Sequence, residues 1–238
     1  MSDIAPLFTP QEWVAIALSL KVATVATLAL LPVSTAIAYA LARKEFYGKT
    51  LLDLLVHVPL VIPPVVTGFI LLALFGRKGP IGAALESCCG LILAFRWTGA
   101  VLAAAVMSLP LMVRAIRLSF EAVDAELLEA SADLGASRWR TFRSILLPLS
   151  LPGIIAGSVL CFAKALGEFG ATITFVSNIP GETQTLPSLI YTFTQVPGGD
   201  ANTYRLAAVS IAISFAALAL SEILSRRAKT LIGRRSLM

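Results

Sequence analysis

Residues 22–42 read VATVATLALLPVSTAIAYALA and contain no Asp, Glu, Lys or Arg. A helix needs about 20 consecutive apolar residues to cross the hydrocarbon core of a bilayer, so this run is long enough. Further runs without these four residue types cover 54–76, 97–113, 144–163 and 206–221. None of the runs alternates apolar and polar residues as the strands of a membrane β-barrel do. The sequence therefore predicts several helices that span a membrane.

The composition of the whole chain agrees with these runs. Of its 238 residues, 57% are hydrophobic and 14% are charged, whereas about 25% of the residues in a soluble domain are charged. Too few charges remain to cover a surface that faces water. The net charge of +5 therefore indicates no nucleic-acid partner, because in a membrane chain the positions of the cations matter more than their sum. We interpret Cys88, Cys89 and Cys161 as small apolar residues, because their spacing suits no metal site.

These features predict an all-α membrane protein in which residues 1–238 form a single transmembrane domain. Five transmembrane helices are expected, at about 13–42, 56–75, 93–113, 149–173 and 206–224. The second span carries Pro59, Pro63 and Pro64, and each proline removes a helix hydrogen bond. We expect this span to be bent or broken, which a membrane tolerates only where protein or a water-filled path satisfies the backbone.

The distribution of Lys and Arg predicts the orientation of the chain. Most of these 19 residues follow the first, third and fifth spans, and few follow the second and fourth. Cytoplasmic loops of membrane proteins carry such an excess of cations. We therefore expect the N-terminus outside and the C-terminus in the cytoplasm, with residues 114–148 as the longest cytoplasmic loop.

That loop contains a predicted helix and its stop signal. The stretch SFEAVDAELLEASADL, residues 119–134, has the periodicity of an amphipathic helix. Its apolar face holds Val123, Leu127, Ala130 and Leu134. Gly135 is the expected end of this helix, and Ser137 can cap a second, shorter one.

The second short helix carries an aromatic pair, Trp139 and Phe142, among Arg138, Arg140 and Arg143. An aromatic side chain with a basic rim is suited to dock into a groove of a partner protein. The same composition also suits a helix that lies on anionic lipid headgroups. Composition alone leaves both interpretations open.

The spacing within this loop resembles the EAA signature of ABC importer permeases. The signature is E-A-A, three residues, G, nine residues and I-x-L-P. Here it reads Glu129-Ala130-Ser131, Gly135 and Ile145-x-Leu147-Pro148, and only Ser131 departs from it. The resemblance implies that the loop couples the chain to a cytoplasmic ATPase. The implied coupling residues are Glu129, Ala130, Ser131, Gly135, Arg138, Trp139, Arg140, Phe142 and Pro148.

The chain contains no G-x-x-x-x-G-K-[ST] motif, which cradles nucleotide phosphates in P-loop ATPases. It also shows no His-Glu, Ser-Lys or paired-Asp constellation of the kind that a membrane enzyme needs. We therefore expect no catalytic residue, no metal site and no cofactor in this chain. If ATP drives its transport, the ATPase is a separate chain.

Residues 163–175, AKALGEFGATITF, place ionisable groups inside the fourth span. Lys164 and Glu168 are four residues apart and would share one face of a helix. Ionisable residues at this depth mark a pathway or gate, or else neutralise each other and fix helix packing. The candidate pathway or gate residues are Pro63, Pro64, Lys164, Gly167, Glu168, Phe169, Gly170, Thr172 and Thr174.

Two further stretches resemble the molybdate ABC transporter permeases, in the oxyanion branch of these importers. They are HVPLVIPPVVTG at 57–68 and GEFGATITFVSNIPGETQTLPS at 167–188. With the EAA loop, the likeness extends from about Trp13 to Ser225. It implies the type I importer permease architecture and transport of molybdate, and also of tungstate. The implied location is a bacterial-type cytoplasmic (inner) membrane, which the chain crosses several times in contact with lipid.

The same resemblance implies the partners of the chain. They are a second copy of itself, two cytoplasmic ABC ATPase subunits and an external molybdate-binding protein. Two alternatives remain open at this point. The substrate of such a permease could be sulfate or another oxyanion. An ion-coupled secondary carrier would instead use Lys164, Glu168 and His57 as a relay, although His57 is better interpreted as structural.

Overall fold

The computed structural model describes residues 8–235, with side chains through Arg227. Every regular element in this range is a helix, and no strand occurs in it. In chain order the elements are α1 (Pro10–Arg43), α2 (Lys49–Val61), α3 (Pro64–Phe75), α4 (Pro80–Cys89), α5 (Trp97–Glu121), α6 (Ala125–Asp133), α7 (Arg138–Thr141), the π-helix η1 (Phe142–Leu146), α8 (Leu147–Leu149), α9 (Leu151–Leu166), α10 (Gly170–Val176), α11 (Leu186–Thr194) and α12 (Asp200–Arg235). The predicted all-α fold class is confirmed.

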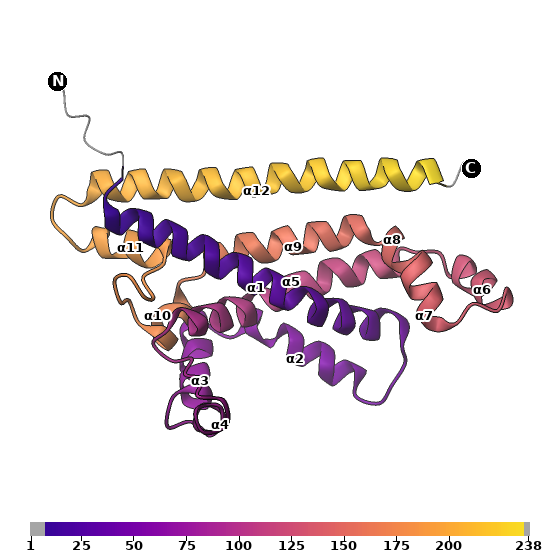
Figure 1. Cartoon of the computed structure of the whole chain (residues 1–238), viewed down its shortest axis with the longest axis horizontal. Coiled ribbons are helices and arrows are strands. Elements are labelled where there is room, and N and C mark those ends of the chain that lie inside the picture. Colours follow the sequence, from indigo (N-terminus) through magenta and orange to yellow (C-terminus); the bar gives the residue numbers. More distant parts are fainter. Residues whose placement is uncertain (1–7, 236–238) are drawn as a thin grey trace.

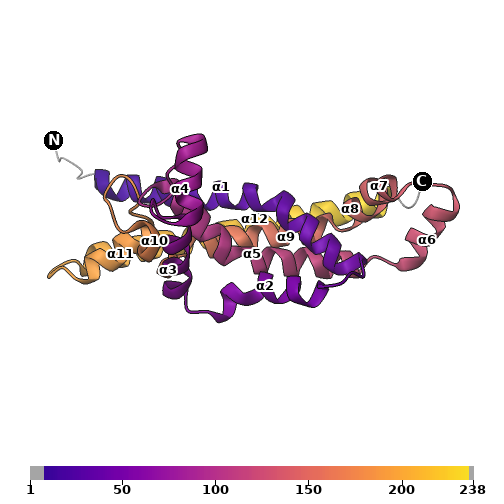
Figure 2. The same ribbon diagram turned by 90° about the horizontal axis from the view of Figure 1, so that it is seen from below.

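The long helices α1, α5, α9 and α12 run along the long axis of the molecule (Figure 1). The helices α3 and α4 stand across this direction, as both views show (Figure 2). The short helices α6 and α7 lie at the end of the molecule where α1 and α12 finish. The helices α10 and α11 lie toward the opposite end, where α1 and α12 begin.

Helix α1 starts with a capping box and continues with a face of small residues. Thr9 Oγ1 accepts a hydrogen bond from the Glu12 amide (3.3 Å), and Glu12 Oε2 accepts one from the Thr9 amide (2.7 Å). Farther along, Ala23 and Ala26 are fully buried in one cluster with Ala100 of α5. Small side chains let two helices in a membrane approach closely. They explain why α1 and α5 form the most extensive helix pair of the molecule.

Three helices, α1, α5 and α12, are individually long and apolar enough to cross a membrane. Two further candidates are bent pairs. The pair α2–α3 is bent by 115°, and the segment Arg138–Leu149 meets α9 at 68°. If each bent pair is one span, the described residues contain five.

The second expected span, 56–75, begins too late, but the break predicted within it is confirmed. Helix α2 starts earlier, at Lys49, and Pro63 lies between α2 and α3. Pro64 is the first residue of α3. A backbone amide at this position has no acceptor within the helix, so a proline there removes no helical hydrogen bond. Pro59 lies inside α2 without ending it, so the break depends on the adjacent pair of prolines.

The third expected span, 93–113, is displaced. Helix α5 begins at Trp97 and continues to Glu121. Arg114 and Arg117, at the start of the predicted cytoplasmic loop, therefore continue the helix α5. The charges of these residues do not end a helix whose other face, including Ile116, stays buried.

The fourth expected span, 149–173, is not one helix. Helix α9 ends at Leu166, and α10 begins at Gly170 after a short irregular segment. Lys164 therefore lies in the last turn of α9, and Glu168 lies beyond its end. The prediction that these two residues share a helical face is wrong.

Two helices, α4 and α11, lie between the expected spans, where the sequence analysis predicted no helix. Cys88 and Cys89 end α4, exposed, with their sulfur atoms 3.0 Å apart. The hydrogen bond shared with Cys88 raises the pKa of the Cys89 thiol above its ordinary value. Cys161, by contrast, is buried in α9.

Helix α3 packs directly on α10 because two glycines leave room where the helices meet. A Cβ on Gly68 would lie 2.5 Å from the Ala171 carbonyl oxygen and 2.8 Å from the Thr174 Cβ. A Cβ on Gly170 would lie 2.7 Å from the Cβ of Pro64. The helix break before α3 and the helix break before α10 are therefore neighbours in space.

We expect Gly68→Ala to destabilise the folded protein by about 1–3 kcal/mol, since the new methyl group must push the α10 backbone away. Gly167→Ala is the matched control, because only the Ala163 carbonyl oxygen, at 3.7 Å, faces a Cβ there. Thermal unfolding of both variants in detergent micelles measures the difference. An unchanged unfolding temperature for Gly68→Ala, or an equal drop in the control, would contradict the close packing.

Candidate functional site

The first candidate site is the coupling loop, defined as residues 124–150, which contains α6, α7, η1 and α8. At its start, Asp124 Oδ1 accepts a hydrogen bond from the Glu126 amide (3.0 Å) and caps α6. At the other end of α6, Gly135 has a φ of +77°, and its amide donates to the Ala132 carbonyl (2.8 Å). Gly135 thus ends α6 in the left-handed conformation that glycine adopts most easily.

Hydrogen bonds hold α6 and α7 together. The hydroxyl oxygens of Ser131 and Thr141 are 2.9 Å apart, and Ser131 is buried. Ser137 caps α7 by accepting a hydrogen bond from the Arg140 amide (3.3 Å), as the sequence predicts. Ser131 is the residue that departs from the EAA signature, and its hydroxyl makes a bond that alanine could not make.

The apolar residues predicted to share one face of a helix over 119–134 are mostly exposed. That single helix does not form, because α5 ends at Glu121 and α6 begins after Asp124. Val123 is buried, whereas Leu127 is 50% exposed and Leu134 is 89% exposed. The coupling loop therefore presents apolar side chains that its own chain does not cover.

Trp139 extends this exposed apolar surface. Its side chain is 68% exposed and stacks on Phe142, with ring centroids 5.5 Å apart. Phe142 in turn contacts the rings of Tyr39 in α1 (5.2 Å) and Phe120 in α5 (6.2 Å). The aromatic contacts thus connect the surface of the coupling loop to two of the long helices.

Two sets of hydrogen bonds attach the ends of the coupling loop to the long helices α1 and α5. Arg43 Nη2, at the end of α1, donates to the carbonyl oxygens of Phe120 and Val123. A positive charge there is favoured by the dipole of α5, because the C-terminal end of a helix carries partial negative charge. Ser119 and Ser150 exchange hydrogen bonds, each hydroxyl donating to the other's carbonyl at 3.2 and 3.3 Å. The sequence analysis missed these contacts, although an arginine in a last helical turn is a signal for capping.

The remaining predicted coupling residues lie on the surface of this loop or at its end. Glu129 and Ala130 are exposed on α6, and Arg138 and Arg140 are exposed on α7. Pro148 lies in α8, directly after the π-helix. The sequence-predicted coupling residues therefore do come together in space.

The second candidate site is the translocation segment, defined as residues 163–175 together with Pro63 and Pro64. Lys164 Nζ lies 2.7 Å from Glu168 Oε2, so the predicted ion pair forms even though Glu168 is outside the helix. Glu168 Oε1 accepts a hydrogen bond from the Ala171 amide (3.0 Å) at the start of α10. The Glu168 side chain is 2% exposed and that of Lys164 is 32% exposed. Both carboxylate oxygens are therefore used within the chain, while the ammonium group remains partly accessible.

The threonines of α10 differ in their bonding. Thr174 Oγ1 donates to the Gly170 carbonyl (2.9 Å), which is a bond within the helix. Thr172 is buried. On the facing helix α3, the buried Thr67 hydroxyl has no hydrogen-bond partner among the described residues. The pairing of α3 and α10 therefore brings polar groups into an otherwise apolar region.

Phe169 connects the translocation segment to α11, a helix that the sequence analysis did not predict. The Phe169 ring lies 5.2 Å from the ring of Tyr191. The signal that could have revealed α11 is apolar residues at helical spacing, namely Leu186, Leu189, Ile190 and Phe193.

The coupling loop and the translocation segment lie toward opposite ends of the molecule, joined by α9 (Figure 1). The structure does not assemble the alternative relay through His57. Within the described residues, the polar contacts of His57 are with Asp53 of the same helix, at 2.8 Å to its carbonyl and 3.3 Å to its carboxylate.

These features are those of a helical membrane component with a surface loop that exposes apolar side chains. Residues 13–230 match the family of binding-protein-dependent transport system inner membrane components. Because this match covers most of the chain, the chain belongs to that family of inner-membrane transport components. Its location in an inner membrane, crossed several times, follows from this membership and from its apolar helices.

Among relatives, the chain is similar to molybdenum transport system permease proteins ModB. It is 56% identical to that of Escherichia coli (strain K12) over 96% of this chain and 100% of the relative. It is 54% identical to the ModB protein of Haemophilus influenzae, over 92% of this chain and 96% of that relative. The sulfate transport system permease protein CysW of Synechococcus elongatus is 40% identical over 65% of this chain and 54% of its own length.

Solved structures agree on the fold. A bacterial ABC transporter that imports the acidic polysaccharide alginate superposes with a TM-score of 0.70 at 17% identity, over 92% of this chain and 80% of that chain. The inward-facing MetNI methionine ABC transporter superposes with a TM-score of 0.67 at 14% identity. The match covers 91% of this chain and 94% of that chain. The predicted fold of an ABC importer permease is thereby confirmed.

Proposed function

We propose that this chain is the permease subunit of an ATP-driven importer of molybdate. The observation that carries the proposal is the 56% identity, over 96% of the chain, to a molybdenum transport permease. Sulfate is the second candidate substrate, and it has less support because the sulfate permease matches only 65% of the chain. Tungstate is expected to pass with molybdate. The whole chain, residues 1–238, acts as one transmembrane domain, with its N-terminus outside and its C-terminus in the cytoplasm.

In this proposal the coupling loop docks onto a cytoplasmic ATPase, which is a separate chain. The exposed Leu127, Leu134 and Trp139 support this role, because a short surface segment with several large exposed apolar side chains is typical of an interaction site. Glu129 and Gly135 set the charge and the turn of the docking surface. The assembly contains two copies of this chain, two ATPase subunits and an external molybdate-binding protein.

The translocation segment serves as the gate of the pathway. Broken helices in a membrane leave backbone groups that can line a path, and the breaks before α3 and α10 lie together. Lys164 supplies a positive charge toward the molybdate dianion, and Glu168 holds that charge in place. Neutral donors such as Thr172 bind an anion weakly enough for it to leave.

ATP and the loaded binding protein each act by favouring one conformation of the gate over the other. A ligand shifts such an equilibrium only by its difference in affinity for the two states. Arg43 and the Ser119–Ser150 contacts attach the coupling loop to the long helices, so movement of the loop is passed to the rest of the chain.

Uptake of labelled molybdate into vesicles tests the proposal. The vesicles contain this chain with its ATPase, and the binding protein is added outside. We expect uptake that needs ATP and that unlabelled molybdate or tungstate suppresses, while equimolar sulfate does not. Uptake by this chain alone, driven by an ion gradient and indifferent to ATP, would instead identify a secondary carrier. Suppression by sulfate at equal concentration would identify a sulfate permease.

A further inference from the structure

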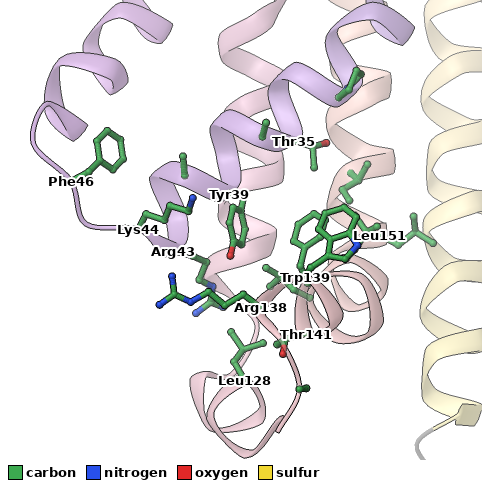
Figure 3. Close-up of a pocket in the computed structure, with 18 of the residues that line it drawn as sticks. Thr35, Tyr39, Arg43, Lys44, Phe46, Leu128, Arg138, Trp139, Thr141 and Leu151 are labelled. Atoms are coloured by element: carbon green, nitrogen blue, oxygen red, sulfur yellow. The ribbon is translucent and has the colours of Figure 1, made fainter. Parts of the chain in front are cut away.

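A groove of about 1680 Å³ lies between α1 and the coupling loop (Figure 3). This volume exceeds the roughly 300–1,000 Å³ of typical small-molecule sites. One wall is the second half of α1, and the other is formed by α6, α7, η1 and the start of α9. The groove is open to the surroundings.

The body of the groove is apolar. Leu31 and Ala36 line it from α1, and Leu147, Leu151 and Ile154 line it from the opposite wall. Helix α6 contributes Leu128 and Ala132, whereas Leu127 and Glu129, on other sides of α6, do not line the groove. The surface of α6 that faces the groove is therefore distinct from the surface proposed to dock onto the ATPase.

Cations gather at one end of the groove. Figure 3 shows Arg43, Lys44 and Arg138 close to Tyr39. Arg43 is bonded to two backbone carbonyls, but neither Lys44 nor Arg138 has a carboxylate within salt-bridge distance in residues 8–227. Glu45, the acidic residue of the lining, pairs with Lys49 at 2.7 Å. Lys44 and Arg138 thus lie near each other without a counter-anion from the part of the chain that the structure describes.

We propose that this groove binds an anionic phospholipid. Its acyl chains lie along the apolar walls, and its phosphate lies between Lys44 and Arg138. Basic pockets between membrane helices recognise acidic headgroups in this way. Tyr39 flanks the headgroup, as aromatic residues do at the boundary between lipid and water. The lipid contacts the coupling loop on the side that faces α1 and supports the position of the loop against α1.

Native mass spectrometry of the full-length permease, purified in detergent, tests the site. Phosphatidylglycerol is titrated in, with phosphatidylcholine and inorganic phosphate as comparison ligands. We expect retention of phosphatidylglycerol, weaker retention of phosphatidylcholine and no competition by inorganic phosphate. Lys44→Gln/Arg138→Gln should weaken retention about 30-fold, because each cation near an anionic lipid contributes about fivefold.

Two further variants separate the groove from general charge and from folding. Ala36→Trp fills the groove from an exposed position, so we expect a folded protein that no longer retains the lipid. Arg140→Gln removes the same charge as Arg138→Gln from outside the groove and should retain it. The proposal would be overturned if the double variant retained phosphatidylglycerol as well as the unchanged permease does. It would also be overturned if the unchanged permease retained phosphatidylcholine equally well, or if Ala36→Trp retained phosphatidylglycerol normally. If Arg138→Gln instead lost only ATPase binding, the groove would belong to the protein partner.

Discussion

Glu168→Ala is expected to give a poorly folded permease with no measurable uptake. The substitution removes the partner of Lys164 and the acceptor of the Ala171 amide at the start of α10. Breaking a buried ion pair from one side costs about 3–5 kcal/mol, and the lower end applies here because Lys164 is partly exposed. The folded fraction is measured by size-exclusion chromatography and thermal unfolding in detergent. Stability equal to that of the unchanged protein would show that the ion pair does not hold α10.

The double variant Lys164→Met/Glu168→Gln separates packing from transport. It removes both charges and keeps an oxygen that can accept from the Ala171 amide. We expect its stability to recover toward that of the unchanged protein, because no charge is left buried alone. Uptake should nevertheless stay about tenfold or more below normal, since a hydrogen bond from a charged group contributes about 1.5–3 kcal/mol. Normal uptake by the double variant would mean that the pair serves only helix packing.

Glu129→Gln is expected to uncouple ATP hydrolysis from uptake while leaving insertion and folding intact. Glu129 is exposed, and none of the described residues forms an ion pair with it, so its own chain does not need it. Any loss of function must then arise at the contact with a partner. Uptake per ATP hydrolysed, measured in the vesicles described above, is the readout. Glu126→Gln is the matched control, because Glu126 is exposed on the same helix but lies outside the EAA-like spacing.

Gly135 provides an independent test of the same loop. Nothing lies within 4 Å of a Cβ placed there, so only the φ of +77° opposes a side chain. Gly135→Val should strain the turn by about 1–2 kcal/mol and reduce binding of the ATPase, whereas Gly135→Asn should be tolerated. Co-purification of the ATPase with each variant shows the difference. Undiminished uptake by both Glu129→Gln and Gly135→Val would contradict the coupling role of this loop.

Features that depend on a few neighbouring residues could be predicted from the sequence. The end of α6 at Gly135 and the cap of α7 by Ser137 follow from contacts within one helical turn. The apolar helices follow from long runs without charge. By contrast, the end of α9 at Leu166 was not predicted, because a glycine in an apolar run indicates a possible break without placing it.

The sequence by itself determined that this protein is helical, lies in a membrane and displays a capped loop with a docking signature. These properties arise from composition and from contacts between residues close in the chain. Only the tertiary structure decided that Gly68 meets Ala171, that Arg43 reaches Phe120, and that α1 and the coupling loop enclose a groove. Such contacts join residues far apart in the chain, and they depend on how closely small side chains let the helices approach.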